Sequence, residues 1–470
     1  MSSLRTSYWY ISLYLKKHVK IIIGAILVGV LVFAGLLPFL TNLPQLKPTR
    51  YIGVIGSFNF STLPKPIQNQ ISLGLTHIEE DGSASPELSQ RWSIEDDGKT
   101  YRFILKNGIH WQDGKLLEPK DISFNFQDTQ IITTENEIIF KLKEPFAPFP
   151  VVLSQPLFRE VQTSYLRFFK RNKIIGIGSY EVTKTTYQDD LLSELILDSA
   201  AERIVYRFYL TEDRALVAYE HGKIDEIQDV SDISTFDNWP NTVTTRKINK
   251  DQYLGIFFNQ NDPLFEKNVR QALSYSLTKG DPNLRTKSPI SPISWAYLDG
   301  VKSYGFDLDR AMERMFDTMP QQPLNITLTT TLRFQDEAEQ IKKEWENFGK
   351  LTSEKCHTSG EIKDKTLCDN TKISVTINLT NFPDVGNYQA LLIGQEIPTD
   401  PDQYTLWDST QNTNFTHYKN PRIDALLENG RKTSDQNQRK AIYQEFQQFL
   451  LEDAPAIFLH YLESYSVKRT

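Results

Sequence analysis

The pattern of apolar and polar residues is clearest over residues 91–126, where it predicts short strands joined by tight turns. Thr100–Leu105 alternates β-branched or aromatic residues with polar ones, as a half-buried strand does. The turn before it ends in Asp97-Gly98, and Asn107-Gly108 after it is a strong hairpin signal. Pro119 then stands where the first turn of a helix tolerates proline. This stretch therefore predicts a twisted β-layer followed by a helix.

The second half of the chain alternates strand and helix patterns. Leu324–Thr330 alternates like a strand, residues 336–348 repeat apolar side chains at helical spacing, and Ile373–Leu379 predicts a further strand. Residues 414–455 predict two amphipathic helices, and Ile457–Tyr461 predicts a strand after them. This succession is typical of an α/β lobe.

The N-terminus predicts a membrane anchor. Residues 21–40 form a 20-residue run without a charge, and residues 1–20 carry basic but no acidic side chains. Such a run matches a hydrocarbon core of about 30 Å, and the basic flank places the N-terminus in the cytoplasm. A cleaved signal peptide is the alternative, but its apolar region is usually shorter, about 7–15 residues, and residues 33–38 offer no clean cleavage site. We expect a single-pass protein of the cell membrane whose remainder is extracytoplasmic.

Composition and missing motifs exclude several functions. The formal net charge of −7 and the pI near 5.7 argue against nucleic acid as a partner. The chain lacks the phosphate-binding loop of ATPases and the nucleophile and zinc motifs of hydrolases, so we expect neither enzyme activity nor a cofactor. Its two cysteines, Cys356 and Cys368, flank a polar insert, and a disulfide between them would stabilise the fold by about 3 kcal/mol. Metal binding with His357 is the less favoured alternative, because no second histidine is near.

Four blocks of residues resemble the extracytoplasmic solute-binding proteins of oligopeptide and dipeptide ABC importers, known as family 5. The first block matches the family order Trp, Asp-Gly-x-x-Tyr-x-Phe-x-Leu, Gly-x-x-Trp-x-Asp-Gly and then an acidic helix start. Three more matches lie in residues 253–279, 387–402 and 414–461. The first block is carried here by Trp92, Asp97, Gly98, Tyr101, Phe103, Leu105, Gly108, Trp111, Asp113, Gly114, Asp121, Ile122, Ser123 and Phe124.

The resemblance implies a two-lobed α/β fold of the type II periplasmic-binding-protein kind, with an extra β-rich subdomain, closing by a hinge on a peptide or other small solute. The partners would be an ABC permease and its ATPase. Together, the resemblance and the predicted anchor divide the chain into six parts. The first three are an N-terminus at 1–20, a transmembrane helix at 21–40 and a linker at 41–50. The others are lobe I at 51–72 with 160–250 and 455–470, the β-rich subdomain at 73–159, and lobe II at 251–454.

The candidate ligand-binding residues come from the third and fourth blocks. In the family, an acidic residue between a Gly-Trp pair and an Asp-Pro pair binds the α-ammonium of the peptide, and a buried ammonium does require a carboxylate partner. Here Gly394-Gln395 stands at the Gly-Trp position, so Glu396 is the first candidate and Asp400 the second. The alternative is that both are solvated loop acids. Tyr461 and Glu463, on the strand that lines the ligand cleft in the family, are further candidates.

Departures from the family leave other functions open. The β-rich subdomain is shorter than in typical members, and the chain lacks their last segment. A membrane-anchored solute sensor is therefore an alternative to an importer subunit. Nickel, haem or a sugar are alternative solutes, since this fold hosts several.

Overall fold

The computed structural model describes residues 2–41, 47–165, 169–236, 239–360 and 364–470. Two compact units make up the chain: Met1–Arg50 with Ala200–Arg203, and Tyr51–Ser199 with Ile204–Thr470. The first unit contains α1, a single helix over Ser2–Thr41. Residues 42–46 of the predicted linker lie outside the described residues.

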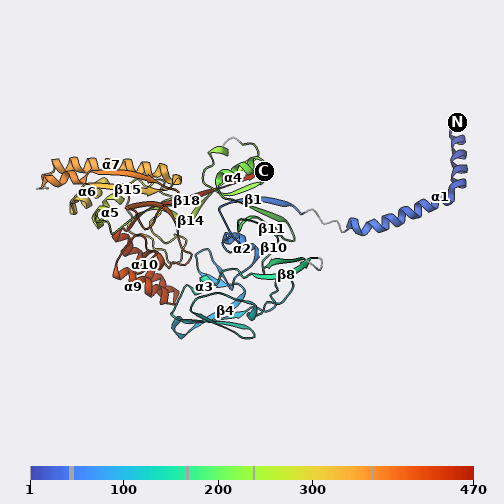
Figure 1. The fold of residues 1–470 in the computed structure, drawn as a ribbon, viewed down its shortest axis with the longest axis horizontal. Coiled ribbons are helices and arrows are strands. Elements are labelled where there is room, and N and C mark those ends of the chain that lie inside the picture. Colours follow the sequence, from blue (N-terminus) through green and yellow to red (C-terminus); the bar gives the residue numbers. More distant parts are fainter. Residues whose placement is uncertain (1, 42–46, 166–168, 237–238, 361–363) are drawn as a thin grey trace. The chain divides into compact units, whose positions relative to one another are not determined.

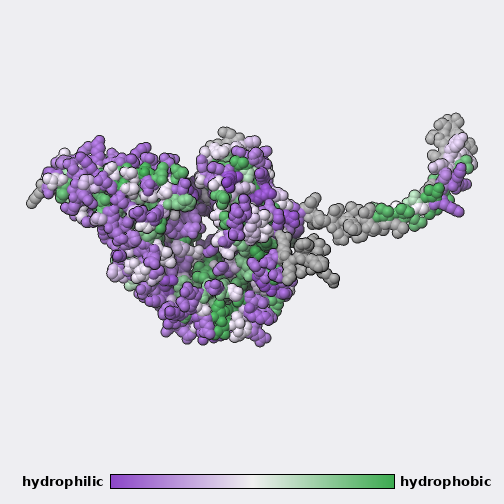
Figure 2. Space-filling view, in the orientation of Figure 1, coloured by the Kyte–Doolittle hydropathy of each residue, from purple (hydrophilic) through white to green (hydrophobic). Residues whose placement is uncertain are grey.

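The expected helix over residues 21–40 is present as part of α1, but its membrane-spanning character is not confirmed. Among the residues that the structure describes, no helix is both long and apolar enough to cross a bilayer. Lys16, Lys17 and Lys20 lie in the N-terminal half of α1, before residues 21–40. Figure 2 shows hydrophobic residues on the part of α1 that follows these lysines.

A ten-stranded mixed sheet runs through the second unit, in the order β10-β11-β12-β1-β13-β18-β14-β17-β15-β16 (Figure 1). Strands far apart in the sequence are neighbours in it, since the C-terminal strand β18 lies between β13 and β14. The strands are β1 (Thr49–Ile55), β10 (Glu181–Gln188), β11 (Leu191–Asp198), β12 (Arg203–Tyr209), β13 (Glu226–Val230), β14 (Thr242–Phe258), β15 (Leu324–Thr330), β16 (Ile373–Leu379), β17 (Ala390–Glu396) and β18 (Ala456–Arg469).

Two long strands, β14 and β18, connect the halves of this sheet. β13 pairs with β18 near its C-terminal end, between Tyr465 and Lys468. β17 pairs with β14 at the other end, over residues 252–258. Between these points β14 and β18 pair with each other in antiparallel fashion, with register shifts between Asn249 and Tyr253 and between Leu254 and Gly255. The two strand groups therefore attach to opposite ends of one ribbon, which we call the β14–β18 ribbon.

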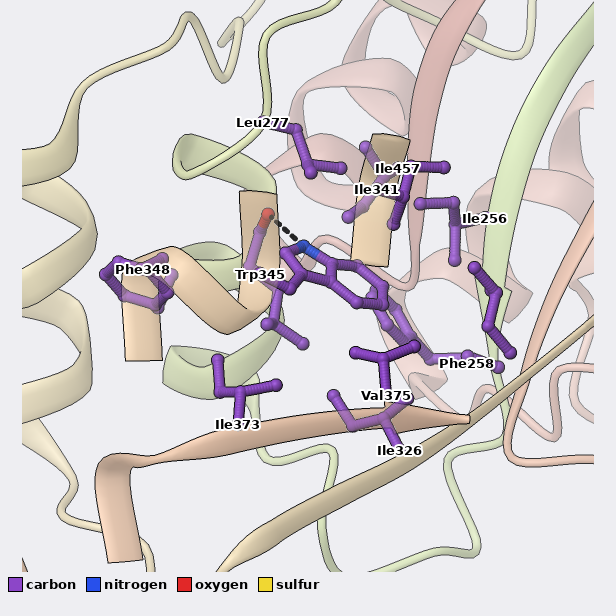
Figure 3. Packing of buried hydrophobic residues seen from close by; sticks show 14 of the residues in the cluster. Ile256, Phe258, Leu277, Ile326, Ile341, Trp345, Phe348, Ile373, Val375 and Ile457 are labelled. Atoms are coloured by element: carbon purple, nitrogen blue, oxygen red, sulfur yellow. Dashed lines mark hydrogen bonds between the residues drawn. The ribbon is translucent and has the colours of Figure 1, made fainter. Parts of the chain in front are cut away.

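Helices pack on both faces of this part of the sheet, but on different strands. On one face α5 (Lys267–Tyr275), α6 (Leu308–Asp317) and α7 (Gln335–Thr358) share a core with β14, β15, β16 and β17. On the other face α9 (Pro421–Lys432) and α10 (Gln436–Asp453) share a core with β14, β17 and β18. Figure 3 shows Trp345 of α7 at the centre of the first face, where its indole nitrogen donates to Leu273 O at 3.1 Å. The predicted strand–helix–strand succession is confirmed here, because the inward residues of each element are those of its apolar pattern.

The stretch with the clearest sequence pattern forms a separate four-stranded antiparallel sheet, β4-β5-β7-β6. Its strands are β4 (Ser89–Glu95), β5 (Thr100–Leu105), β6 (Thr129–Thr133) and β7 (Glu137–Leu142). Phe103 and Phe140 are fully buried in its core. The predicted helix after Pro119 is wrong, because only one 3₁₀ turn forms there, at Pro119–Asp121. The residues that follow it, Ile122 to Phe126, alternate apolar and polar, so an extended chain packs every second side chain on the core.

The remaining elements are short or lie at the sheet margins. In the structure Cys356, at the end of α7, and Cys368 form the disulfide that the sequence suggested. The other elements are α2 (Lys65–Ile71), β2 (Thr76–Ile78), β3 (Ala84–Pro86), α3 (Phe149–Val152), β8 (Arg159–Tyr165), β9 (Phe169–Ile175), α4 (Glu212–Glu220), α8 (Tyr404–Trp407), and 3₁₀ turns at Asp96–Gly98, Ser234–Phe236, Leu332–Phe334 and Lys365–Thr371.

Candidate functional site

The parallel strands β15, β16 and β17 end at one edge of the sheet, which we call the carboxyl edge. β15 pairs with β16 on one side and with β17 on the other, both in parallel. In the sheet, β16 and β17 thus lie on opposite sides of β15. The chain leaves β15 toward one side to form β16 and then crosses back to form β17 on the other side. In open α/β sheets, ligands bind outside the carboxyl ends of the strands where the strand order reverses. The carboxyl edge is such a place.

β17 extends beyond β15 at the carboxyl edge. Its residues 393–396 lie past the last β15 pair, Thr330 with Leu392, and pair only with β14. Side chains alternate along a strand, so Glu396 and Gly394 lie on one face and Gln395 on the other. Glu396 is exposed, and its carboxylate has no ion pair or hydrogen bond within the described part of the chain. It is an available negative charge at the carboxyl edge.

An arginine that the sequence did not single out lies at the same edge. Arg333 belongs to the 3₁₀ turn directly after β15, and it is exposed with no ion pair among the described residues. If Gly394 carried a β-carbon, that carbon would lie 3.7 Å from the ring of Phe334, the residue after Arg333. This turn therefore lies beside β17. The signal that could have identified Arg333 is its position, because it is the basic residue between a predicted strand and the helix that follows.

The second candidate acid, Asp400, already has a partner within the protein. Its two carboxylate oxygens accept hydrogen bonds from the Arg439 guanidinium at 3.0 and 2.7 Å, and both residues are buried. Burial by itself would lower the pKa of Arg439, but the attraction of Asp400 outweighs it and the pKa is raised. Asp400 therefore ties the loop after β17 to α10, and its contact with a ligand stays a prediction.

A second ion pair supports the same loop. Asp402 lies 3.2 Å from Arg431 of α9. Burial raises the pKa of Asp402 above the usual value for an aspartate, although Arg431 opposes the shift. The Arg431 guanidinium also stacks over the ring of Tyr404, 4.3 Å from its centroid. The loop after β17 is thus fixed at two points by buried or half-buried charge pairs.

The segment that carries the four-stranded sheet touches this loop. Gly82, at φ +84°, approaches Thr399 so closely that a β-carbon would lie 2.5 Å from the Thr399 carbonyl oxygen. Trp295 N donates to Asp81 O at 3.0 Å, and Ala147 N donates to Arg431 O at 2.6 Å. These contacts bring residues 81–147 against residues 295–431. The loop after β17 is therefore held from both sides.

The two candidate ligand-binding residues on β18, Tyr461 and Glu463, lie in different surroundings. Tyr461 stands opposite Tyr253, which stands opposite Gln395, so the three lie in one row across the strands. Tyr461 is only 5% exposed and belongs to the core under α9 and α10, and its burial raises the pKa of its hydroxyl. Glu463 forms an ion pair with Arg246 of the β14–β18 ribbon. These residues therefore belong to the core and to the ribbon rather than to the carboxyl edge.

The described residues contain no group of three or more His, Cys, Asp or Glu side chains placed to hold a metal ion. The carboxyl edge instead carries the Glu396 carboxylate, the Arg333 guanidinium and exposed apolar groups such as Leu332 and Phe382. Such an edge suits an organic solute that carries both signs of charge.

The fold of the second unit is that of two-lobed solute-binding proteins. The NikZ protein of Campylobacter jejuni, solved in complex with Ni(L-His), superposes with a TM-score of 0.68 at 22% identity, covering 90% of this chain and 94% of that one. The oligopeptide-binding protein AppA of Bacillus subtilis, solved with a nonapeptide, gives 0.59 at 21% identity with the same coverage. The structural likeness establishes a two-lobed α/β periplasmic-binding-protein fold.

The sequence comparison is more specific. The model of the bacterial extracellular solute-binding proteins, family 5 Middle, matches residues 83–130 and 131–414. The dipeptide-binding protein of Escherichia coli is 23% identical over 80% of this chain and 80% of its own length, and B. subtilis AppA is 23% identical over 88% and 84%. The chain belongs to family 5 of the bacterial extracellular solute-binding proteins.

Proposed function

We propose that this protein is the substrate-binding component of an ABC importer and that its solute is a peptide with a free amino terminus. The observation that carries the proposal is the pair of charged side chains at the carboxyl edge, Glu396 and Arg333, neither of which forms an ion pair among the described residues. A short peptide is a zwitterion, so a carboxylate and a guanidinium at one sheet edge complement both of its ends. Relatives named as dipeptide-binding and oligopeptide-binding proteins support the same class of solute.

In this proposal Glu396 binds the α-ammonium of the peptide. An ammonium that leaves water for a closed cleft needs a carboxylate partner, and the other candidate, Asp400, already has one in Arg439. Arg333 binds the peptide carboxylate, or a backbone carbonyl when the peptide is longer. Gly394 and Gln395 contribute the exposed backbone of β17 beside them.

The binding movement is a hinge at the β14–β18 ribbon. The lobes are residues 51–72 with 160–250 and 455–470, and residues 251–454, with residues 73–159 as the smaller subdomain. This division is supported by the attachment of β13 and β17 to opposite ends of the ribbon and by the register shifts between those ends. Peptide binding favours the closed arrangement because the peptide has more contacts in it.

No chemical step is part of this function. The closed, loaded protein delivers the peptide to a membrane permease, whose ATPase supplies the energy. The proposal further includes attachment of the chain to the cell membrane by residues 21–40, on the sequence pattern alone. Extraction of membranes with carbonate tests the attachment, since an anchored protein stays with the membrane pellet and a released one moves to the supernatant.

The solute is tested by identifying what the protein carries. The full chain is purified without denaturation, and small molecules released from it are identified by mass spectrometry. Peptides with free amino termini are the expected result. Recovery of a nickel–histidine complex or of haem would contradict the proposal; some relatives are solved with nickel complexes or named for haem binding.

A thermal shift measurement is the independent check. A pool of free peptides should raise the melting temperature, because a ligand that binds only the folded state stabilises it. The same pool with acetylated amino termini and amidated carboxyl termini is the matched control, and it should give a smaller rise. Equal rises in melting temperature with both pools would contradict the proposal that the protein binds the charged ends of the peptide.

A further inference from the structure

A small basic cavity lies away from the carboxyl edge, between α5, β18 and the segment 279–304. Its volume is about 20 Å³. Four cationic side chains line it: Lys279, Arg285, Lys287 and Lys302. Thr286 and Tyr304 also line it, and no acidic side chain of the described residues does. Only Lys302 has a carboxylate partner within the described residues, Glu452 at 2.7 Å.

Lys279 places its amino group in the interior of the protein. It is 9% exposed, and its ammonium donates to Ser274 O and Tyr304 O. Those two bonds use two of the three ammonium hydrogens. Burial, with Arg285 as a further cause, lowers the pKa of Lys279 to about 7. The carbonyl oxygens orient this ammonium, and no carboxylate contacts it.

Arg285 is held at the cavity by backbone contacts on both sides. Tyr461 N donates to Leu284 O at 2.8 Å, and Thr286 N donates to Leu459 O at 3.1 Å. These bonds fix the segment 284–286 on β18. The Nε of Arg285 is buried and has no hydrogen-bond partner in the described part of the chain. The segment thus presents an unpaired donor at the cavity that Lys279 also lines.

The size of the cavity limits what can occupy it. A cavity needs about 10–15 Å³ to hold one water-sized particle, so this one accepts such a particle. A buried ammonium and a half-buried guanidinium that line one cavity without a counter-charge among the described residues are costly, and an anion between them offsets that cost where a neutral water does not.

We propose that this cavity binds one halide ion, chloride under ordinary conditions, between the Lys279 ammonium and the Arg285 guanidinium. The ion ties the segment 284–286 and the loop that carries Lys279 to the same point of β18. This site is separate from the carboxyl edge and does not depend on what the protein transports.

The test compares the full chain in sodium chloride and in sodium gluconate at equal ionic strength. We expect the melting temperature to be higher in chloride by about 2 °C, to saturate with chloride concentration, and to lose this difference in Lys279→Met. Lys250→Met, which removes an exposed lysine that does not line the cavity, is the matched control and should keep the difference.

Chloride-35 NMR line broadening provides a second readout that does not depend on unfolding. Broadening by the wild type that falls in Arg285→Gln supports the site, including when Lys279→Met fails to fold. Equal melting temperatures in the two salts with no broadening would overturn the proposal and leave water as the occupant. A chloride effect retained in both Lys279→Met and Arg285→Gln would overturn it as well.

Discussion

The four-stranded sheet β4–β7 and the carboxyl edge of β15–β17 are built in opposite ways. The sheet is filled by aromatic side chains; Phe140 packs against Phe103, Phe124 and Phe149 at centroid distances of 5.1–5.9 Å. The carboxyl edge is organised by polar contacts, such as the ion pair of Asp400 with Arg439 in the loop after β17. One region stabilises the fold, and the other leaves charges free for a solute. Changes in the two regions should therefore affect different measurements.

The largest effect is expected from Asp400→Asn. It leaves the buried Arg439 guanidinium without a counter-charge, which should lower the free energy of unfolding by about 3–5 kcal/mol in urea titrations. The matched control is the double variant Asp400→Leu with Arg439→Met, which replaces both charges and should recover most of that loss. If the single variant were as stable as the wild type, the loop after β17 would not depend on this pair.

Phe140→Ala tests the other region. Phe140 is fully buried, so its truncation should cost about 3–5 kcal/mol of unfolding free energy. The peptide affinity of the folded fraction, measured by calorimetry well below the melting temperature, should equal that of the wild type. A loss of affinity at unchanged folded fraction would place the four-stranded sheet in the binding site.

Gly82→Ala examines the junction between the two regions. The new methyl group would clash with the Thr399 carbonyl and also strain a positive φ, so residues 81–82 must move away from the loop after β17. We expect a loss of peptide affinity of about tenfold, or about 1.4 kcal/mol. Gly108→Ala, at a positive φ with open space around it, controls for backbone strain alone and should leave affinity unchanged.

The two regions also differ in how far the sequence predicts them. β5 and the helix α7 follow from local alternation and helical spacing. β5 is found where expected, whereas α7 begins where expected but continues past residue 348 to Thr358. The helix predicted after Pro119 failed because the alternation of Ile122, Phe124 and Phe126 favours an extended chain. Local patterns thus describe the scaffold well.

The site could be predicted only in part, because its chemistry depends on partners distant in sequence. Asp400 is paired with Arg439, 39 residues away. Glu463 is paired with Arg246, and Tyr461 is buried by the packing of α9 and α10. Arg333 becomes a candidate only when β15 and β17 are known to be parallel neighbours. Burial and pairing of this kind are properties of the folded chain.

The central claim is that Glu396 binds the peptide ammonium, and calorimetry with one peptide in two forms tests it most directly. The wild type should bind the free-amine form at least about tenfold more tightly than the N-acetylated form. Glu396→Gln should lose that preference by weakening only the free-amine form. Equal losses for both forms, or a preference that persists in Glu396→Gln, would contradict the claim.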